Sequence, residues 1–405
     1  MSKRNMFLCA PLAALAVLSS LGGAAVAQSG YKIGISGAAT GPASPSYLPH
    51  IEGIRLYVLQ LNDKGGIDGE KIDAVFLDDK AAPSEAASNA KRLMDDEQVL
   101  AVGLMSLSST YTPMFQAATR TNTPVLLLGQ AVCPANAAGP QMNPLVFCGG
   151  STSDPKTAGN WQVPLVKALA EKHGDQLKLA LVAADIPISR QGIDYMEQLA
   201  KSMSIDVVNK QAIPLGAADV SGAASAIIAS GANYVTSWAP VTTAVQMLGA
   251  LRRQGWNGWY IHNHSAEAED TLQKLKDPKL IMSPEYAFTV EKLPVFSEIA
   301  AAAKKYGINT PVDEMILGWA SGMILESALG HCGPTCTREK LVGVLDGLSV
   351  KTDGIYPDPV SWTKNDHRRP ASFAAYAWDP RSQSVRRITD WARVKDAPAT
   401  VKVLD

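Results

Sequence analysis

The sequence lacks an excess of charge of either sign. It contains 37 lysine and arginine residues against 38 aspartate and glutamate residues, and its formal net charge is −1. No basic stripe or polybasic segment stands out along the chain. Nucleic acids and anionic membrane surfaces are bound mainly through clustered basic side chains. We therefore expect neither a nucleic-acid partner nor a membrane-surface partner.

Long apolar runs are also lacking, except at the N-terminus. Lys3 and Arg4 precede an apolar run over residues 6–17, and small residues lead to the sequence AVA at residues 25–27. This order is typical of a secretory signal peptide. The run is shorter than the ~20 residues that cross a bilayer, which argues against the alternative of a membrane anchor. We therefore expect a signal peptide over residues 1–27 and an exported, soluble chain after it.

Cysteine is scarce, and only four of the five cysteines follow the predicted signal peptide. They are Cys133, Cys148, Cys332 and Cys336. An even number in an exported chain favours two disulfides, and four cysteines allow three pairings. We favour Cys133–Cys148 with Cys332–Cys336, because these pairs close two short loops. The alternative is a metal site, which the C-x3-C spacing with a distant second pair supports only weakly.

Short apolar segments alternate with amphipathic segments from residue 31 onward. The expected strands cover residues 32–36, 71–77, 99–105, 124–129, 177–184, 207–213, 234–239 and 259–264. The expected helices cover residues 45–64, 83–97, 191–203, 220–230, 241–255, 315–329 and 338–348. The strands are apolar throughout, which is typical of parallel strands covered on both faces. The sequence predicts an α/β fold with two doubly wound units in series, and a hairpin from residues 374–378 and 385–388.

Three loops follow predicted strands of the first unit and are candidates for a binding site. They are Gly37–Tyr47, Ser106–Thr110 and Gly129–Cys133. Open parallel sheets bind ligands beyond the carboxyl ends of their strands. Hydroxyl groups and free backbone N–H groups at a helix N-terminus suit a carboxylate. The alternative is that Ser108 or Ser109 does no more than cap the helix that follows.

Two motifs in the first unit resemble those of a known family. The run NDKGGIDG at residues 62–69 is the more specific, and Asp78-Asp79 before a Pro-x-x-Ala helix supports it. Both resemble the periplasmic receptors of branched-chain amino acid ABC transporters, and the resemblance covers most of the mature chain, more weakly after about Pro278. It implies a type I periplasmic binding protein, in which two Rossmann-like lobes joined by a three-segment hinge close on a small molecule.

The resemblance also implies domain boundaries, location and partners. Lobe 1 would comprise residues 28–151 with about 282–350, and lobe 2 about 152–281 with about 351–390. Residues 391–405 would form a C-terminal tail. The protein would act in the periplasm as a monomer without cofactor or metal, and would deliver its ligand to the membrane permease of an ABC transporter.

Site residues carry over from the family only in part. The family's serine-rich turn corresponds to Ser106–Thr110, and its Ala-Ala-Thr turn corresponds to Gln130–Cys133, where Cys133 replaces threonine. In the second lobe, two tyrosine positions correspond to Ser189 and to the neighbourhood of Trp238. The candidate ligand-binding residues are Tyr47, Ser106, Ser108, Ser109, Gln130 and Ala131 in lobe 1, and Ser189, Arg190, Trp238 and His264 in lobe 2.

The departure at His264 bears on the ligand. In the family, an acidic residue at or beside this position receives the ligand's α-ammonium group. A buried ammonium without an acceptor costs several kcal/mol. We therefore expect a small carboxylate without the amino group, such as an aromatic or branched acid, with Trp238 as a flat apolar wall. In a shifted alignment, Glu267 or Glu269 would supply the missing acid.

Other functions have less support. The nucleophile elbow, H-E-x-x-H, Walker A and G-x-G-x-x-G motifs are absent, so we expect no enzyme. His262 and His264 could face one side of a strand, but no third metal ligand is fixed by spacing. Residues 366–369 (DHRR) are predicted to form a polar surface loop. The remaining alternatives are branched-chain amino acid binding and a sensor of the same fold that signals to a partner protein.

Overall fold

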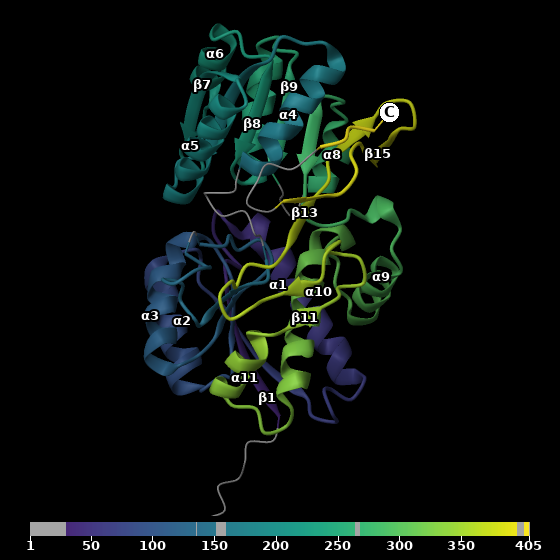
Figure 1. The fold of residues 1–405 in the computed structure, drawn as a ribbon. Coiled ribbons are helices and arrows are strands. Elements are labelled where there is room, and N and C mark those ends of the chain that lie inside the picture. Colours follow the sequence, from purple (N-terminus) through teal and green to yellow (C-terminus); the bar gives the residue numbers. More distant parts are fainter. Residues whose placement is uncertain (1–29, 135, 151–158, 264–267, 395–400, 405) are drawn as a thin grey trace, which may run out of the picture.

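The computed structural model describes residues 30–134, 136–150, 159–263, 268–394 and 401–404. The predicted signal peptide and His264 lie outside these residues. The described chain forms two α/β lobes, one above the other in Figure 1. None of the helices in the described part is both long and apolar enough to cross a membrane. The predicted α/β class with two doubly wound lobes is therefore confirmed.

The first lobe is built on a parallel five-stranded sheet with the order β2-β1-β3-β4-β5. The strands are β1 (Tyr31–Gly37), β2 (Ile72–Asp78), β3 (Val102–Met105), β4 (Val125–Leu127) and β5 (Val146–Cys148). Strand order reverses around β1, because β2 lies on one side of it and β3 on the other. Loops that follow strands at such a reversal diverge and leave a crevice.

Helices from both ends of the chain cover this sheet. They are α1 (Ser44–Asp63), α2 (Pro83–Lys91), α3 (Tyr111–Thr121), α9 (Pro294–Tyr306), α10 (Val312–Cys332) and α11 (Arg338–Leu345). The helices α1 and α10 approach closely at two glycines. A Cβ atom on Gly53 would lie 2.4 Å from the Met315 carbonyl oxygen, and one on Gly318 would lie 2.1 Å from that of His50. These contacts hold the late helix α10 on the first lobe.

The second lobe is built on a seven-stranded sheet with the order β15-β14-β10-β9-β8-β6-β7. Its parallel strands are β6 (Lys178–Ala184), β7 (Asp206–Ile213), β8 (Tyr234–Trp238), β9 (Trp259–Asn263) and β10 (Leu280–Ser283), and β14 (Tyr376–Asp379) and β15 (Ser384–Arg387) form an antiparallel edge. Its helices are α4 (Gly159–His173), α5 (Pro187–Ser202), α6 (Ser221–Ala229), α7 (Val241–Arg253) and α8 (Ala268–Leu275). The predicted C-terminal hairpin is β14–β15.

Two short antiparallel ladders lie in the last part of the chain, where it returns to the first lobe and then to the second. The strand β11 (Ser349–Val350) pairs with β12 (Val360–Ser361), and β13 (Ala371–Phe373) pairs with β16 (Ala392–Val394). After β12, the indole of Trp362 donates a 3.1 Å hydrogen bond to the carbonyl of Cys148 in the first lobe. The segment up to about residue 369 therefore packs on the first lobe, later than the expected boundary near 350. Within the expected C-terminal tail, residues 392–394 form the strand β16, which pairs with β13.

One local expectation, the surface loop, and one local alternative, the serine cap, were wrong. Residues 366–369 are not a surface loop, because His367 is fully buried and Arg369 is 3% exposed. The ring of His367 stacks on Phe147 at 3.9 Å, and its nitrogens lie 3.0 Å from the Val146 carbonyl and from Asp346. The serines before α3 form a short 3-10 helix, Ser108–Thr110, without a side-chain cap. The burial of His367 and Arg369 depends on partners that are distant in the sequence, so the local sequence around residues 366–369 gives no sign of it.

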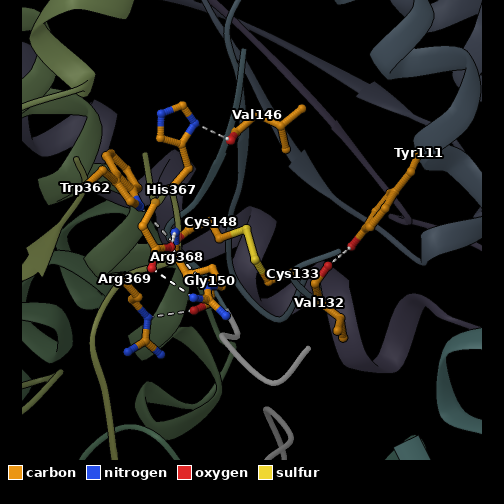
Figure 2. Close-up of a disulfide and its surroundings, with 11 residues drawn as sticks. Tyr111, Val132, Cys133, Val146, Cys148, Gly150, Trp362, His367, Arg368 and Arg369 are labelled. Carbon is orange, nitrogen blue, oxygen red and sulfur yellow. Dashed lines mark hydrogen bonds and ion pairs between the residues drawn. A yellow bond between two sulfur atoms is a disulfide. The ribbon is translucent and has the colours of Figure 1, made fainter. Parts of the chain in front are cut away.

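The expected local disulfides are confirmed. Cys133 bonds to Cys148 across a separation of 15 residues, and Cys332 bonds to Cys336 across a separation of 4. The first disulfide joins the loop after β4 to the end of β5, as Figure 2 shows. The backbone N–H of Cys148 also donates a hydrogen bond to the backbone carbonyl of His367, at 2.8 Å. This disulfide thus fixes a loop of the first lobe to the segment that returns from α11.

Loss of the two disulfides should cost different amounts of stability. Loop-closure entropy gives about 3 kcal/mol for the Cys133–Cys148 loop and about 2 kcal/mol for the much shorter Cys332–Cys336 loop. Denaturant unfolding of Cys133→Ala/Cys148→Ala should therefore show the larger loss in the free energy of unfolding, with Cys332→Ala/Cys336→Ala as the matched control. Equal losses would contradict the expectation.

Candidate functional site

A cavity of about 510 Å³ lies between the carboxyl ends of the two sheets. Its polar lining residues are Ser46, Tyr47, Lys80, Ser108, Gln130, Ser189, Thr242, Thr243, Gln246 and Asn263. Its larger apolar lining residues are Pro42, Pro45, Leu107, Val132, Ile186, Ile188, Leu215, Trp238 and Pro240. Both lobes contribute, so the cavity has the place and the size of a site for a small molecule.

The carboxylate of Asp78 connects two loops that support the first-lobe wall of this cavity. It accepts hydrogen bonds from the backbone N–H groups of Ala39 (3.0 Å) and Lys80 (2.9 Å), and from the hydroxyl of Thr40. Burial raises the pKa of Asp78, but the bonds from Thr40, Lys80 and Ala39 together outweigh burial and hold it below its ordinary value. The loop after β1 and the loop after β2 are thereby tied together.

The neighbouring carboxylate, Asp79, is fully buried and links the loop after β2 to the ends of β1 and β3. It accepts from the hydroxyls of Ser36 (3.1 Å) and Ser106 (2.7 Å) and from the N–H of Ala81 (2.9 Å). Burial raises its pKa, and the bond from Ser106 partly opposes that rise. Ser106 is therefore committed to Asp79 and does not line the cavity.

The other first-lobe candidates divide between the cavity and its support. Ser108 lines the cavity, whereas the hydroxyl of Ser109 donates to the carbonyl of Ala81 at 2.9 Å. Gln130 lines the cavity and is 8% exposed, and its amide nitrogen is buried with no hydrogen-bond partner among the described residues. Ala131 is fully buried behind the lining. Ser108 and Gln130 thus present donors to the cavity.

Tyr47 reaches the cavity from the first turns of α1. Its side chain is 4% exposed, and burial raises the pKa of its phenol well above the ordinary value. The hydroxyl therefore stays protonated over the physiological range and can donate a hydrogen bond to a ligand.

In the second lobe, Trp238 forms a flat apolar wall at the end of β8. The ring lies so close to α5 that a Cβ atom on Gly192 would fall 1.6 Å from two of its ring carbons. Ser189 lines the cavity one turn earlier on α5. Arg190 is absent from the lining and forms an exposed ion pair with Asp185 at 2.5 Å, because the next residue along a helix points to another side.

Six polar lining residues were not among the sequence candidates, and one of them, Ser46, lies in the first turn of α1. Lys80 follows β2, Thr242 and Thr243 begin α7, Gln246 lies one turn further along α7, and Asn263 ends β9. All lie at the ends of strands that face the cavity, or in the loops and helices that follow those strands. The general rule for open parallel sheets points to these loops, but it does not select residues within them.

No carboxylate occurs among the described residues that line the cavity. Glu269, a candidate acid from the sequence, is buried and accepts hydrogen bonds from the backbone N–H and the hydroxyl of Thr289, at 2.6 and 2.7 Å. His264 and Glu267 lie outside the described residues. His262 is buried with its Nδ1 atom 2.8 Å from the Ser237 hydroxyl, and the described chain contains no group of three potential metal ligands.

Comparisons with known proteins agree with this architecture. The family described as periplasmic binding protein matches residues 30–383. An amino acid binding protein of Pseudomonas aeruginosa is 22% identical over 372 residues, which cover 91% of this chain and 96% of its relative.

Solved structures show the same fold. A fatty acid ABC transporter substrate-binding protein from Thermomonospora curvata is similar with a TM-score of 0.72 at 19% identity, covering 91% of this chain and 93% of that chain. A solute-binding protein of an R. palustris ABC transporter, in complex with 4-hydroxybenzoate, is similar with a TM-score of 0.72 at 15% identity, covering 91% of this chain and 96% of that chain. The chain belongs to the periplasmic binding protein family, as a type I member of its branched-chain amino acid group.

Proposed function

We propose that this protein captures a small organic carboxylate without an α-amino group and delivers it to the permease of an ABC importer. The observation that carries the proposal is the make-up of the cavity wall. The described lining offers hydroxyl and amide donors and one lysine, and it offers no carboxylate. A carboxylate ligand finds partners in such a wall, whereas an ammonium group finds none of opposite charge.

The amide nitrogen of Gln130, which has no hydrogen-bond partner within the described part of the chain, supports an acceptor on the ligand. A buried donor without a partner costs free energy, and a ligand oxygen would remove that cost on binding. Lys80 adds positive charge at the mouth of the cavity, although its ammonium already lies 3.4 Å from Glu85 and its side chain is 55% exposed. We therefore assign recognition mainly to the buried donors and only secondarily to Lys80.

The wall formed by Trp238 favours a flat or branched apolar body on the ligand. Tryptophan offers a large rigid face for offset stacking. By their descriptions, the solute-binding protein of R. palustris is in complex with 4-hydroxybenzoate, and the protein of T. curvata is the substrate-binding protein of a fatty acid ABC transporter. Neither kind of acid has an amino group. The ABC transporter role of these relatives supports transport rather than signalling.

A ligand screen should show whether the protein binds a carboxylic acid without an amino group or an amino acid. We expect 4-hydroxybenzoate or a branched-chain carboxylate to raise the apparent stability, by roughly 2.7 kcal/mol at a hundredfold excess over Kd, and leucine to have little effect. Thermal-shift assays followed by calorimetry on the full mature chain measure this. Tight binding of leucine or valine with no binding of any acid would contradict the proposal.

Two adjacent serines provide a matched test of the first-lobe donors. Ser108→Ala removes a hydroxyl from the cavity wall, and a hydrogen bond to a charged group is worth about 1.5–3 kcal/mol. We expect a loss of roughly tenfold to a hundredfold in calorimetric affinity for the acid found in the screen. Ser109→Ala removes the bond to Ala81 and should change affinity much less. Equal losses in the two variants would show that Ser108 is not a direct donor.

A glycine substitution tests the wall formed by Trp238. Gly192→Ala places a methyl group within the volume of the indole, so the ring must shift, at a cost of roughly 1–3 kcal/mol in stability. We expect weaker binding of an aromatic acid together with that loss, measured by calorimetry and denaturant unfolding. Gly343→Ala is the control, since nothing lies within 4 Å of its Cβ position on α11. It should gain roughly 0.5–1 kcal/mol and leave affinity unchanged.

A further inference from the structure

The chain passes between the lobes at three places, and one buried side chain reaches all three. The first passage leaves β5 at Gly150, the second leaves β10 at Glu285, and the third enters β13 at Arg369-Pro370. We propose that Arg369 and Glu285 form a hinge clasp, a positioning pair that sets the angle between the lobes. This goes beyond the proposed function, because it concerns the protein without its ligand.

The guanidinium of Arg369 makes a separate contact with each passage. Its Nε atom donates to the Gly150 carbonyl at 2.7 Å, and its Nη2 atom donates to the Glu285 carboxylate at 2.5 Å. Its Nη1 atom donates to the carbonyl of Pro370 at 3.0 Å. Figure 2 shows the contact with Gly150 beside the Cys133–Cys148 disulfide. The rigid fork of arginine can hold several acceptors in one plane, which a lysine cannot do.

Burial makes these contacts obligatory. The side chains of Arg369 and Glu285 are 1% and 2% exposed, so neither charge has access to bulk water. The ring of Tyr356 covers the guanidinium at 3.9 Å from its centre. Breaking a buried ion pair is strongly unfavourable. The three passages therefore have to move together whenever the lobes move.

The clasp is also joined to the first-lobe wall of the cavity. The backbone N–H of Arg369 donates to the carbonyl of Cys148, and Cys148 is bonded to Cys133. Cys133 ends the loop that carries Gln130 and Val132 into the cavity. The interlobe angle and the placement of this loop thus depend on one connected set of contacts.

The test compares interlobe distances in the ligand-free protein. Spin labels replace two exposed lysines, Lys91 on α2 of the first lobe and Lys201 on α5 of the second, and double electron–electron resonance measures the distance distribution between them. In Arg369→Lys, which keeps the charge and loses the fork, we expect a broader distribution with a shifted mean. In Glu285→Gln, which keeps the shape and loses the charge, we expect the same change to a smaller degree.

Arg338→Lys is the matched control for general loss of stability. Arg338 also donates from its fork to three backbone carbonyls, those of Met94, Val99 and Thr121, but all of them lie within the first lobe. This variant should lower the melting temperature and keep the wild-type distance distribution. A wild-type distribution in Glu285→Gln would overturn the clasp, as would a distribution in Arg338→Lys as broad as that of the clasp variants. If Arg369→Lys does not fold, the distance distribution of Glu285→Gln still tests the hinge clasp.

Discussion

Two adjacent carboxylates at the end of β2 hold the first-lobe wall of the cavity in place. Asp79 has no access to water, so its oxygens require donors, and Ser36, Ser106 and Ala81 supply them. Asp78 binds the loop after β1 in the same way. Three loops that are distant in sequence are thereby fixed relative to one another. The donors that face the cavity from these loops have a defined geometry only because this network behind them is satisfied.

The second lobe contributes shape more than charge. The face of Trp238 depends on the missing side chain at Gly192, since any larger residue would occupy the space of the indole. Arg190 and Glu269, the nearby charged candidates, are turned to partners outside the cavity. The second-lobe wall thus combines the face of Trp238 with uncharged polar side chains, and the first-lobe wall adds Lys80 to its hydroxyl and amide donors. Together they suit a molecule with one acidic end and one apolar body.

The passages between the lobes combine two kinds of constraint. The Cys133–Cys148 disulfide is covalent and local, whereas the Arg369–Glu285 pair is electrostatic and joins segments more than eighty residues apart. Both meet at Cys148, whose backbone bonds to His367 and Arg369.

The sequence by itself determined the α/β class, most strands, the two disulfides and the loops that border the cavity, because apolar periodicity, short cysteine spacings and strand-end loops are local signals. It also named Tyr47, Ser108, Gln130, Ser189 and Trp238, all of which line the cavity. Only the tertiary structure decided that Ser106 and Ser109 support the wall and that His367 and Arg369 of the DHRR run are buried. Those outcomes depend on Asp79, Ala81, Glu285 and Gly150, which are brought close by folding, and no spacing along the chain encodes such contacts.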